Sequence, residues 1–414
     1  MKAFRKPVYM AAGYYTVSFG SGRKEFHPKK PRPGLEEYIK EAGEGVIAQL
    51  LNPACIDEGI IANFMAARFN KQGNLAAMFP AIHSSLAFKP HTRVEGACGS
   101  GGLALYTAMK SILSDLSDVV LAMGVEVQNT VKAIYGADYL AGAGHFRSQR
   151  KQGHAYFFPN QFSDRAGAMY EKYGYDLVRR AMAKWYEQAI LAARRCPKAQ
   201  EYHNAMPDPF SVAMIPPHPE SFVPHLNVFD CSKVSDGAAG LIVASREGLD
   251  RAGIPLDKAV QVVGWGTAVA DLTRLPDDLT RLETTERAVK HAYAMAGIGP
   301  GQLGLLETHD CFTVTGLQSL EAAGIVGEGE AMDYVLEGRC MLDGTLPVNT
   351  SGGLIGYGHY TGGSGVRKGV DLILQLTGAA NDSQVNIQSD RPFGMLISMG
   401  GNDRTVTAVI ARAA

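Results

Sequence analysis

The chain has 414 residues, 46% of them hydrophobic and 20% charged, so it can bury one large core or two medium ones. This composition excludes a fibrous or disordered protein, and no charge-free apolar run is long enough to predict a membrane span. The 40 lysines and arginines balance 41 aspartates and glutamates, so no overall basic field exists that would bind nucleic acid or an anionic membrane.

The ends of the chain and its cysteines favour a cytoplasmic enzyme. The first residues, MKAFRKPVYMAAGYYT, carry basic side chains but no sustained apolar core, and the last, VTAVIARAA, are not a peroxisomal signal. The six cysteines are scattered, without a CxxC pair or a Cys/His cluster of zinc-ligand spacing. We therefore expect reduced thiols and no metal site.

Apolar β-branched runs alternate with helical patterns along residues 1–127. A helix-like pattern, GLEEYIKEAGEGVIAQLL, follows the first run, and further helical stretches separate the later ones. This alternation predicts a buried sheet flanked by helices, which is an α/β layer structure. The expected strands are RKPVYMAAG, DEGIIANFM, HTRVEGA and SDVVLAMGVEV.

Residues 128–234 break this rhythm, because they are rich in Tyr, Phe, Pro, His and Arg and contain only isolated helical patterns. A long and largely irregular insertion in a compact enzyme is usually a binding or lid element. We therefore assign residues 128–234 to a loop domain. The first α/β half then comprises residues 1–127 and 235–258.

A second α/β half is expected over residues 259–414. Helical patterns around residues 286–295 and 313–323 and from Lys368 onward alternate there with apolar runs. The expected strands are AVQVVGWGTAV, LGLLETHD, LPVNTSGG, FGMLISMGG and RTVTAVIAR.

Cys98 lies where an expected strand runs into a glycine-rich helix start, in HTRVEGACGSGGLALYTAMKSIL. The free N–H groups and the dipole at a helix N-terminus favour a thiolate, and the glycines let a substrate approach the backbone. A buried structural cysteine is the alternative. Taken alone, the motif favours neither interpretation.

Two further segments favour catalysis. LLETHDCFTVTGLQSL places His309 and Cys311 in a turn between an apolar strand and a helix, and NTSGGLIGYGHYTGGSGVRKG places His359 in a glycine-dense loop before a helix. A single histidine is more often structural than catalytic. Here two cysteines and two histidines each follow an apparent strand, so a nucleophile and a base are expected to converge at the carboxyl end of a sheet.

VEGACGSGG, SDGAAG at residues 235–240, ETHDCF and NTSGGLIGYGH followed by GGSG resemble, in the same order, the landmarks of the thiolase superfamily. The match spans essentially the whole chain, and HDCF is similar to the sterol-carrier-protein-2 type of thiolase. The resemblance implies the thiolase fold, with two similar α/β halves packed as αβαβα layers and an inserted loop domain. It also implies an acetyl-CoA C-acyltransferase without a metal or tightly bound cofactor, with coenzyme A (CoA) as co-substrate.

The sequence departs from the family at two positions. Ser398 stands where many thiolases have the cysteine of a Cys-x-Gly motif, and Tyr360 follows His359 where the family usually has proline. In HDCF-type relatives the cysteine of the HDCF motif is thought to be the acid/base partner. Cys311 is therefore expected to replace the missing thiol. Tyr360 is expected to reshape the pocket.

The resemblance also implies a role for each site residue. His359 takes the proton of Cys98, whose thiolate attacks the 3-keto carbon of a 3-oxoacyl-CoA, and CoA then collects the acyl group. Cys311 protonates the departing carbon and later deprotonates the incoming thiol. Two oxyanion holes are expected, one from the side chains of His309 and His359 and one from the backbone N–H groups of Cys98 and Gly400.

The loop domain contains the substrate clue. HFRSQRKQGH holds Arg147, Arg150 and Lys151 without an acidic residue, which indicates either a solvated surface or an anion site for CoA phosphates or a substrate carboxylate. Some relatives, such as benzoylsuccinyl-CoA thiolases, have aromatic and dicarboxylic substrates. We therefore expect degradation of a bulky, aromatic or dicarboxylic 3-oxoacyl-CoA. The aromatic residues around this stretch are Tyr135, Tyr139, Phe146, Tyr156, Phe157 and Phe158.

Two alternatives stay open. One is a biosynthetic acetoacetyl-CoA thiolase or a condensing enzyme, and the other is a non-catalytic thiolase-like subunit that binds acyl-CoA. Retention of Cys98, His309, Cys311 and His359 weighs against the second. The resemblance further implies a homodimer or dimer of dimers. Some relatives bind a small zinc-ribbon and OB-fold subunit, which would here be a separate chain.

Overall fold

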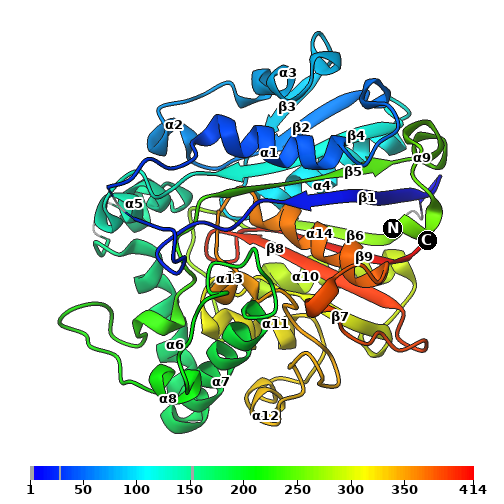
Figure 1. Ribbon diagram of the computed structural model, residues 1–414. Helices are drawn as coiled ribbons and strands as arrows, with labels where there is room; N and C mark the ends of the chain where they lie inside the picture. The colour runs from blue at the N-terminus through cyan, green and yellow to red at the C-terminus, as the bar shows by residue number, and fades with distance from the viewer. Residues whose placement is uncertain (1–3, 28, 151–152) are drawn as a thin grey trace.

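The computed structural model describes residues 4–27, 29–150 and 153–414 (Figure 1). Lys151 lies outside the described residues. The strands are β1 (Val8–Tyr15), β2 (Glu58–Ala62), β3 (His91–Val94), β4 (Val119–Glu126), β5 (Gly237–Ala244), β6 (Ala259–Val269), β7 (Leu303–Glu307), β8 (Phe393–Gly400) and β9 (Thr405–Ala413). The helices are α1 (Leu35–Ile47), α2 (Ala66–Phe69), α3 (Phe79–Ile82), α4 (Ser100–Leu113), α5 (Ala133–Leu140), α6 (Phe157–Tyr173), α7 (Tyr175–Ala193), α8 (Pro209–Ala213), α9 (Arg246–Ala252), α10 (Glu283–Ala296), α11 (Thr313–Ala322), α12 (Ala331–Leu336), α13 (Gly353–Gly356) and α14 (Ser364–Leu376).

The strands form one nine-stranded mixed sheet in the order β3-β2-β4-β5-β1-β6-β9-β8-β7. Strands β1 to β5 belong to the first half of the expected fold, and β6 to β9 to the second. Strand β1 joins the halves, because it pairs antiparallel with β5 on one side and with β6 on the other. The β2–β3, β2–β4 and β7–β8 pairs are parallel.

Helices α4 and α14 lie between the two halves of the sheet. Each contacts strands of both halves: α4 packs on β2, β4 and β8, and α14 packs on β1, β5 and β8. Helix α1 covers the other face of the first half and α10 that of the second (Figure 1). One hydrophobic cluster lies under α1, one around α4 and α14, and one between the second half and α6, α7 and α10. The predicted layered α/β fold is confirmed.

The segment between β4 and β5 contains helices α5 to α8 and, in its described part, no strand. Helices α6 and α7 pack on each other and on α11 of the second half. Trp185 of α7 is fully buried, and a Cβ on Gly316 of α11 would collide with its ring. The insertion is therefore anchored to the second half of the fold.

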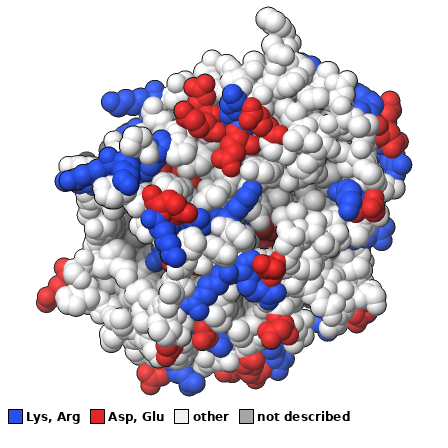
Figure 2. All heavy atoms as spheres, viewed as in Figure 1, with Lys and Arg blue, Asp and Glu red and all other residues white. Residues whose placement is uncertain are grey.

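The surface mixes charges of both signs. Lysines and arginines lie next to aspartates and glutamates on the face shown in Figure 2, in agreement with the near-zero net charge. Exposed pairs such as Arg287 with Glu283, at 2.6 Å, neutralise one another locally. Within the described ranges, no helix combines the length and apolar character required to cross a bilayer.

Candidate active site

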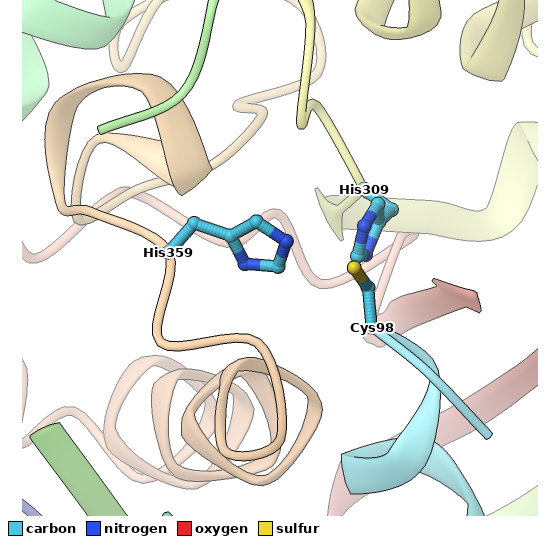
Figure 3. Close-up of side chains that lie close together, drawn as sticks. All are labelled: Cys98, His309 and His359. Carbon is cyan, nitrogen blue, oxygen red and sulfur yellow. The ribbon is translucent and has the colours of Figure 1, made fainter. Parts of the chain in front are cut away.

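Cys98, His309, Cys311 and His359 meet in one cavity of about 410 Å³. The Cys98 sulfur and a ring nitrogen of each histidine lie within 4.8 Å of one another (Figure 3). The four residues come from the turn before α4, the turn between β7 and α11, and the loop before α14. The fold thus brings together the side chains that the sequence analysis singled out.

Cys98 lies in a tight turn between β3 and α4. The preceding residue, Ala97, has φ of 54°, a left-handed conformation that costs a residue with a Cβ about 1–2 kcal/mol. The Ser100 hydroxyl stabilises this turn, since it donates to the Ala97 carbonyl at 2.6 Å and accepts the Gly96 N–H at 3.0 Å. The surrounding structure therefore holds the turn before Cys98 in a strained conformation.

The helix does not make Cys98 a thiolate. Burial raises the pKa of the Cys98 thiol well above its ordinary value, and the nearby Cys311 raises this pKa further. The prediction that the helix N-terminus favours a thiolate is thus wrong for the unliganded protein, because desolvation outweighs the helix dipole. Cys98 is a thiol at neutral pH and needs a base.

The hydrogen bonds of His359 make its Nε2 a proton acceptor. The Ser364 hydroxyl donates to the Tyr360 carbonyl at 3.0 Å, so its oxygen accepts the Nδ1 proton of His359 at 2.9 Å. Nε2 then keeps its lone pair, and this buried atom has no hydrogen-bond partner in the described part of the chain. Burial lowers the pKa of His359 to about 3, so the ring is neutral at neutral pH. His359 can therefore accept the Cys98 proton.

His309 has the opposite tautomer. Its Nδ1 accepts the backbone N–H of Met399 at 3.3 Å and lies 3.5 Å from Nζ of Lys368, which is also a donor. The ring proton is therefore on Nε2, which is buried without a partner among the described residues. Burial and then Lys368 hold the pKa of His309 well below its ordinary value. A neutral ring with a free N–H donor results.

Opposite tautomers suit acyl transfer, because one ring can accept the thiol proton while the other donates to an oxygen that becomes negative. The rings of His309 and His359 lie with centroids 5.3 Å apart at an angle of 83°. Once His359 has taken the proton of Cys98, its Nε2 also becomes a donor. Both histidines can then stabilise an oxyanion.

Cys311 reaches the cavity from the turn after β7. Only 6% of it is exposed, and its sulfur lies 3.9 Å from the Thr315 hydroxyl. Burial raises the pKa of Cys311 to about 12, so it is a protonated thiol. Ser398, in contrast, lies under α4, where its hydroxyl accepts the Gly102 N–H at 3.2 Å, and it is not one of the described residues that line the cavity.

Gly400 packs directly against the turn that holds Cys98. A Cβ on Gly400 would collide with the carbonyl oxygen of Gly96, so this position requires glycine. The next residue, Gly401, lines the cavity. That the N–H of Gly400 joins that of Cys98 in an oxyanion hole stays a prediction.

The spacing of Cys98, His309 and His359 would also suit a metal ion, because one thiol and two imidazoles are a common zinc donor set. Lys368, however, lies 3.5 Å from Nδ1 of His309, and its ammonium would repel a bound cation.

Tyr360 does not enter the cavity. Its ring is fully buried in the cluster around α4 and α14, where a Cβ on Gly237 or Gly363 would lie 2.7 or 2.6 Å from it. The prediction that Tyr360 reshapes the pocket is wrong, because its side chain turns into the core while His359 faces the cavity.

Aromatic and aliphatic side chains form most of the cavity wall. The rings of Phe162 and Phe312, which both line the cavity, stack with centroids 4.4 Å apart. Lys233 is the only charged side chain among the described lining residues. Of the aromatic residues around the basic stretch of the loop domain, Tyr156 and Phe158 line the cavity, whereas Tyr135, Tyr139, Phe146 and Phe157 do not. Further rings come from Phe69 and Phe222.

Several residues at the site carried no clear sequence signal. Nε2 of Gln128 donates to the carbonyls of His359 and Ser235 at 2.7 and 2.9 Å, which fixes the loop that carries His359. The Lys233 carbonyl accepts the His359 N–H at 2.9 Å, and Cys231 also lines the cavity. Of these residues, only Gln128 could have been identified from the sequence, because it directly follows an expected strand.

The described part of the basic stretch, residues 145–150 and 153–154, does not line the cavity. Arg150 pairs with Asp138 at 3.2 Å and lies over the Phe146 ring at 5.8 Å, and Arg147 is likewise absent from the described lining residues. Asp138 lies 12 residues before Arg150 in the chain, outside the stretch that lacks acidic residues. Anion binding by Arg147 and Arg150 stays a prediction.

Replacing Arg147, Arg150 and Lys151 together by glutamine tests this role. If these side chains bind the CoA phosphates, the KM for CoA is expected to rise about threefold to tenfold, and added salt should reduce the difference. Steady-state kinetics at two ionic strengths check this result. Arg339→Gln, which removes another exposed arginine, is the control; an unchanged KM in the triple variant would identify the stretch as solvated surface.

Comparisons with known proteins agree with this geometry. The family model described as "Thiolase, N-terminal domain" matches residues 29–205, and that described as "Thiolase C-terminal domain-like" matches residues 268–412. An acetyl-CoA acetyltransferase of Methanothermobacter thermautotrophicus is 31% identical over 381 residues, which cover 91% of this chain and 94% of that protein.

Two further proteins are similar to the chain in sequence or in fold. The benzoylsuccinyl-CoA thiolase subunit BbsB of Thauera aromatica is 25% identical over 296 residues, 72% of this chain and 73% of that protein. A solved structure named "Ltp2-ChsH2(DUF35) aldolase" has the same fold, with a TM-score of 0.76, 20% identity and coverage of 98% of each chain.

Proposed function

The chain belongs to the thiolase family of acyltransferases, and we propose that it uses Cys98 as a covalent acyl carrier to cleave or form 3-oxoacyl-CoA. The observation that carries this proposal is the meeting of the Cys98 thiol with two imidazoles of opposite tautomer within 4.8 Å. CoA, a substrate of thiolases, is the proposed acyl acceptor. The proposal needs neither a metal nor a tightly bound cofactor.

In the proposed cleavage, Nε2 of His359 takes the proton of Cys98, and the sulfur attacks the 3-keto carbon. The bond between C2 and C3 then breaks, leaving the acyl group on sulfur and an enolate of the departing acyl-CoA. Cys311 protonates C2 and becomes a thiolate, which next removes the proton of CoA. The CoA sulfur attacks the acyl-enzyme, and His359 returns the first proton to Cys98.

Two groups of donors would stabilise the charged oxygens. The Nε2–H of His309 and that of protonated His359 face one space, which suits the enolate oxygen. The backbone N–H groups of Cys98 and Gly400 are proposed for the oxygen of the tetrahedral adduct. Loss of one such donor costs about 10²–10³ in rate in comparable enzymes.

We propose that the acyl group is bulky and aromatic or dicarboxylic, and that the reaction is degradative. The aromatic wall supports a large apolar group, and Lys233 supports a carboxylate beside it. The similarity to a benzoylsuccinyl-CoA thiolase subunit supports the same substrate class. A biosynthetic acetoacetyl-CoA thiolase is the second candidate, favoured by the similarity to an acetyl-CoA acetyltransferase.

Intact-protein mass spectrometry after incubation with a panel of acyl-CoAs tests the proposal. The expected result is a mass increase equal to one acyl group, greatest in yield for aromatic or dicarboxylic acyl groups. An adduct with acetyl-CoA alone would favour the second candidate. No adduct with any acyl-CoA would contradict the acyl-carrier role of Cys98.

Lys233→Met tests whether the substrate carries a carboxylate. A hydrogen bond to a charged group contributes about 1.5–3 kcal/mol, so the KM for a dicarboxylic 3-oxoacyl-CoA is expected to rise about tenfold to a hundredfold. The KM for an apolar 3-oxoacyl-CoA should change little. Lys258→Met, at an exposed lysine outside the cavity, is the control. Equal changes for both substrates would instead indicate a contact with CoA, and no change would contradict the carboxylate.

Assembly and location complete the proposal. A homodimer or dimer of dimers is proposed from the family resemblance alone. A separate zinc-ribbon and OB-fold subunit is supported by the similar fold of a chain named together with a DUF35 partner. A cytoplasmic location is supported by six free cysteines, which suit a reducing compartment. Light scattering of the purified protein and cell fractionation test these points; a monomer or an exported protein would contradict them.

A further inference from the structure

Lys368 is a fully buried lysine behind the two active-site histidines. Its Nζ donates to the Ile397 carbonyl at 2.9 Å and lies 3.5 Å from Nδ1 of His309. The neighbouring Arg367 is paired with Asp371, but the described residues place no carboxylate within ion-pair distance of Lys368. A buried lysine without an ion pair is costly to a fold, so its position calls for a role.

Besides the Ile397 carbonyl, Nδ1 of His309 is the acceptor that lies near Nζ of Lys368. Asp310, the nearest acid in sequence to the histidine, is occupied elsewhere, since it accepts Nε1–H of Trp185 at 3.1 Å and the Leu354 N–H at 2.7 Å. Burial lowers the pKa of Lys368, and the Asp310 charge opposes this shift. An amine and an ammonium both carry N–H donors, so Lys368 donates in either state. The other titratable groups that face it are Glu307, Cys311, His359, Arg367 and Asp371.

A donor to Nδ1 of His309 is needed because two imidazoles lie beside one thiol and must carry their protons on different nitrogens. If His309 carried its proton on Nδ1, the Nε2 lone pair would face the cavity and repel an oxyanion. It would also compete with His359 for the proton of Cys98. The Met399 N–H alone opposes this tautomer with a long hydrogen bond of 3.3 Å. Lys368 supplies the second donor.

We propose that Lys368 is a positioning residue that holds His309 with its proton on Nε2, and so keeps His309 for oxyanion binding while His359 acts as the base. The inference rests on the proposed acyl transfer and extends it to a residue that is not among the described lining residues of the cavity. Lys368 acts through His309 and does not contact substrate.

Lys368→Met removes both the charge and the donors while keeping a long side chain. We expect kcat to fall about tenfold to a hundredfold, which is part of the effect of losing an oxyanion donor. The KM for CoA should stay unchanged. Lys368→Gln keeps an N–H donor without the charge and is expected to regain part of the lost kcat. Equal losses in both variants would overturn the proposed hydrogen bond.

The tautomer can be observed without substrate by NMR of protein labelled with ¹⁵N in histidine, with His309 assigned by comparison with His309→Asn. We expect Nε2–H in the wild-type protein and a mixture of tautomers in Lys368→Met. This readout does not depend on acylation, so it separates failure of this inference from failure of the proposed function. An unchanged tautomer in Lys368→Met would overturn the inference.

A double variant distinguishes positioning from a structural role. If Lys368 acts through His309, Lys368→Met in the His309→Asn background should cause no further loss of kcat. An additive loss would overturn the proposal.

Gln375→Met is the control, because Gln375 is a buried polar residue at the far end of α14 that donates to the Ser383 carbonyl at 2.7 Å. It should lower the thermal midpoint without changing the tautomer. If Lys368→Met does not fold, two other variants replace it in the NMR and double-variant tests. Lys368→Gln is expected to keep the tautomer of His309, and Lys368→Leu is expected to lose it.

Discussion

Cys98→Ala is expected to abolish the acyl adduct and to lower turnover by more than about 10⁴-fold. The variant removes the thiol that is proposed to form the thioester, while His309, Cys311 and His359 keep their places around the cavity. Removing a nucleophile from a preorganised site leaves only the contribution of binding and oxyanion stabilisation. Intact-protein mass spectrometry and steady-state kinetics with the same acyl-CoA measure the two effects.

The cavity also contains Cys231 and Cys311, so the position of the adduct matters. Peptide mapping of the wild-type acyl-enzyme should place the acyl group on Cys98. Cys340→Ala, which removes a buried cysteine outside the cavity, is the control and should form the adduct in full yield. An undiminished adduct on Cys98→Ala would overturn the assignment of the nucleophile.

Cys311→Ser is expected to separate acylation from the carbon–carbon step. Cys98 and His359 remain, so a simple acyl-CoA should still form some acyl-enzyme. Cleavage of 3-oxoacyl-CoA should slow by about a hundredfold or more, because a serine hydroxyl is far too weak an acid to replace a thiol at neutral pH. Single-turnover assays of both steps measure the difference.

Ser398→Ala is the matched control for Cys311→Ser. Its hydroxyl accepts the Gly102 N–H at 3.2 Å, so its removal should cost about 1 kcal/mol of stability with little effect on turnover per folded molecule. Thermal midpoints of both variants show whether a loss of activity reflects unfolding. Near-normal carbon–carbon turnover by a folded Cys311→Ser protein would contradict the acid/base role of Cys311.

The sequence by itself determined the fold class and the identity of the central residues. Apolar runs alternating with helical patterns predict a layered α/β fold, because strands buried on both faces need continuous apolar side chains. The residues brought together in the cavity were also found, since Cys98, His309, Cys311 and His359 each follow an expected strand. The strand expected at residues 346–353, before His359, is reduced to an isolated bridge between Val348 and Leu306. The carboxyl ends of strands are where such turns place reactive groups.

The tertiary structure alone decided the protonation states and the shape of the pocket. Desolvation makes Cys98 a thiol, and the tautomer of His309 depends on donors from β8 and α14, which are far from it in the chain. Tyr360 could not be placed by pattern, because the direction of a loop side chain depends on the core beneath it. These properties depend on contacts between segments that are remote in sequence. Desolvation and hydrogen bonding between such segments exist only once the chain has folded.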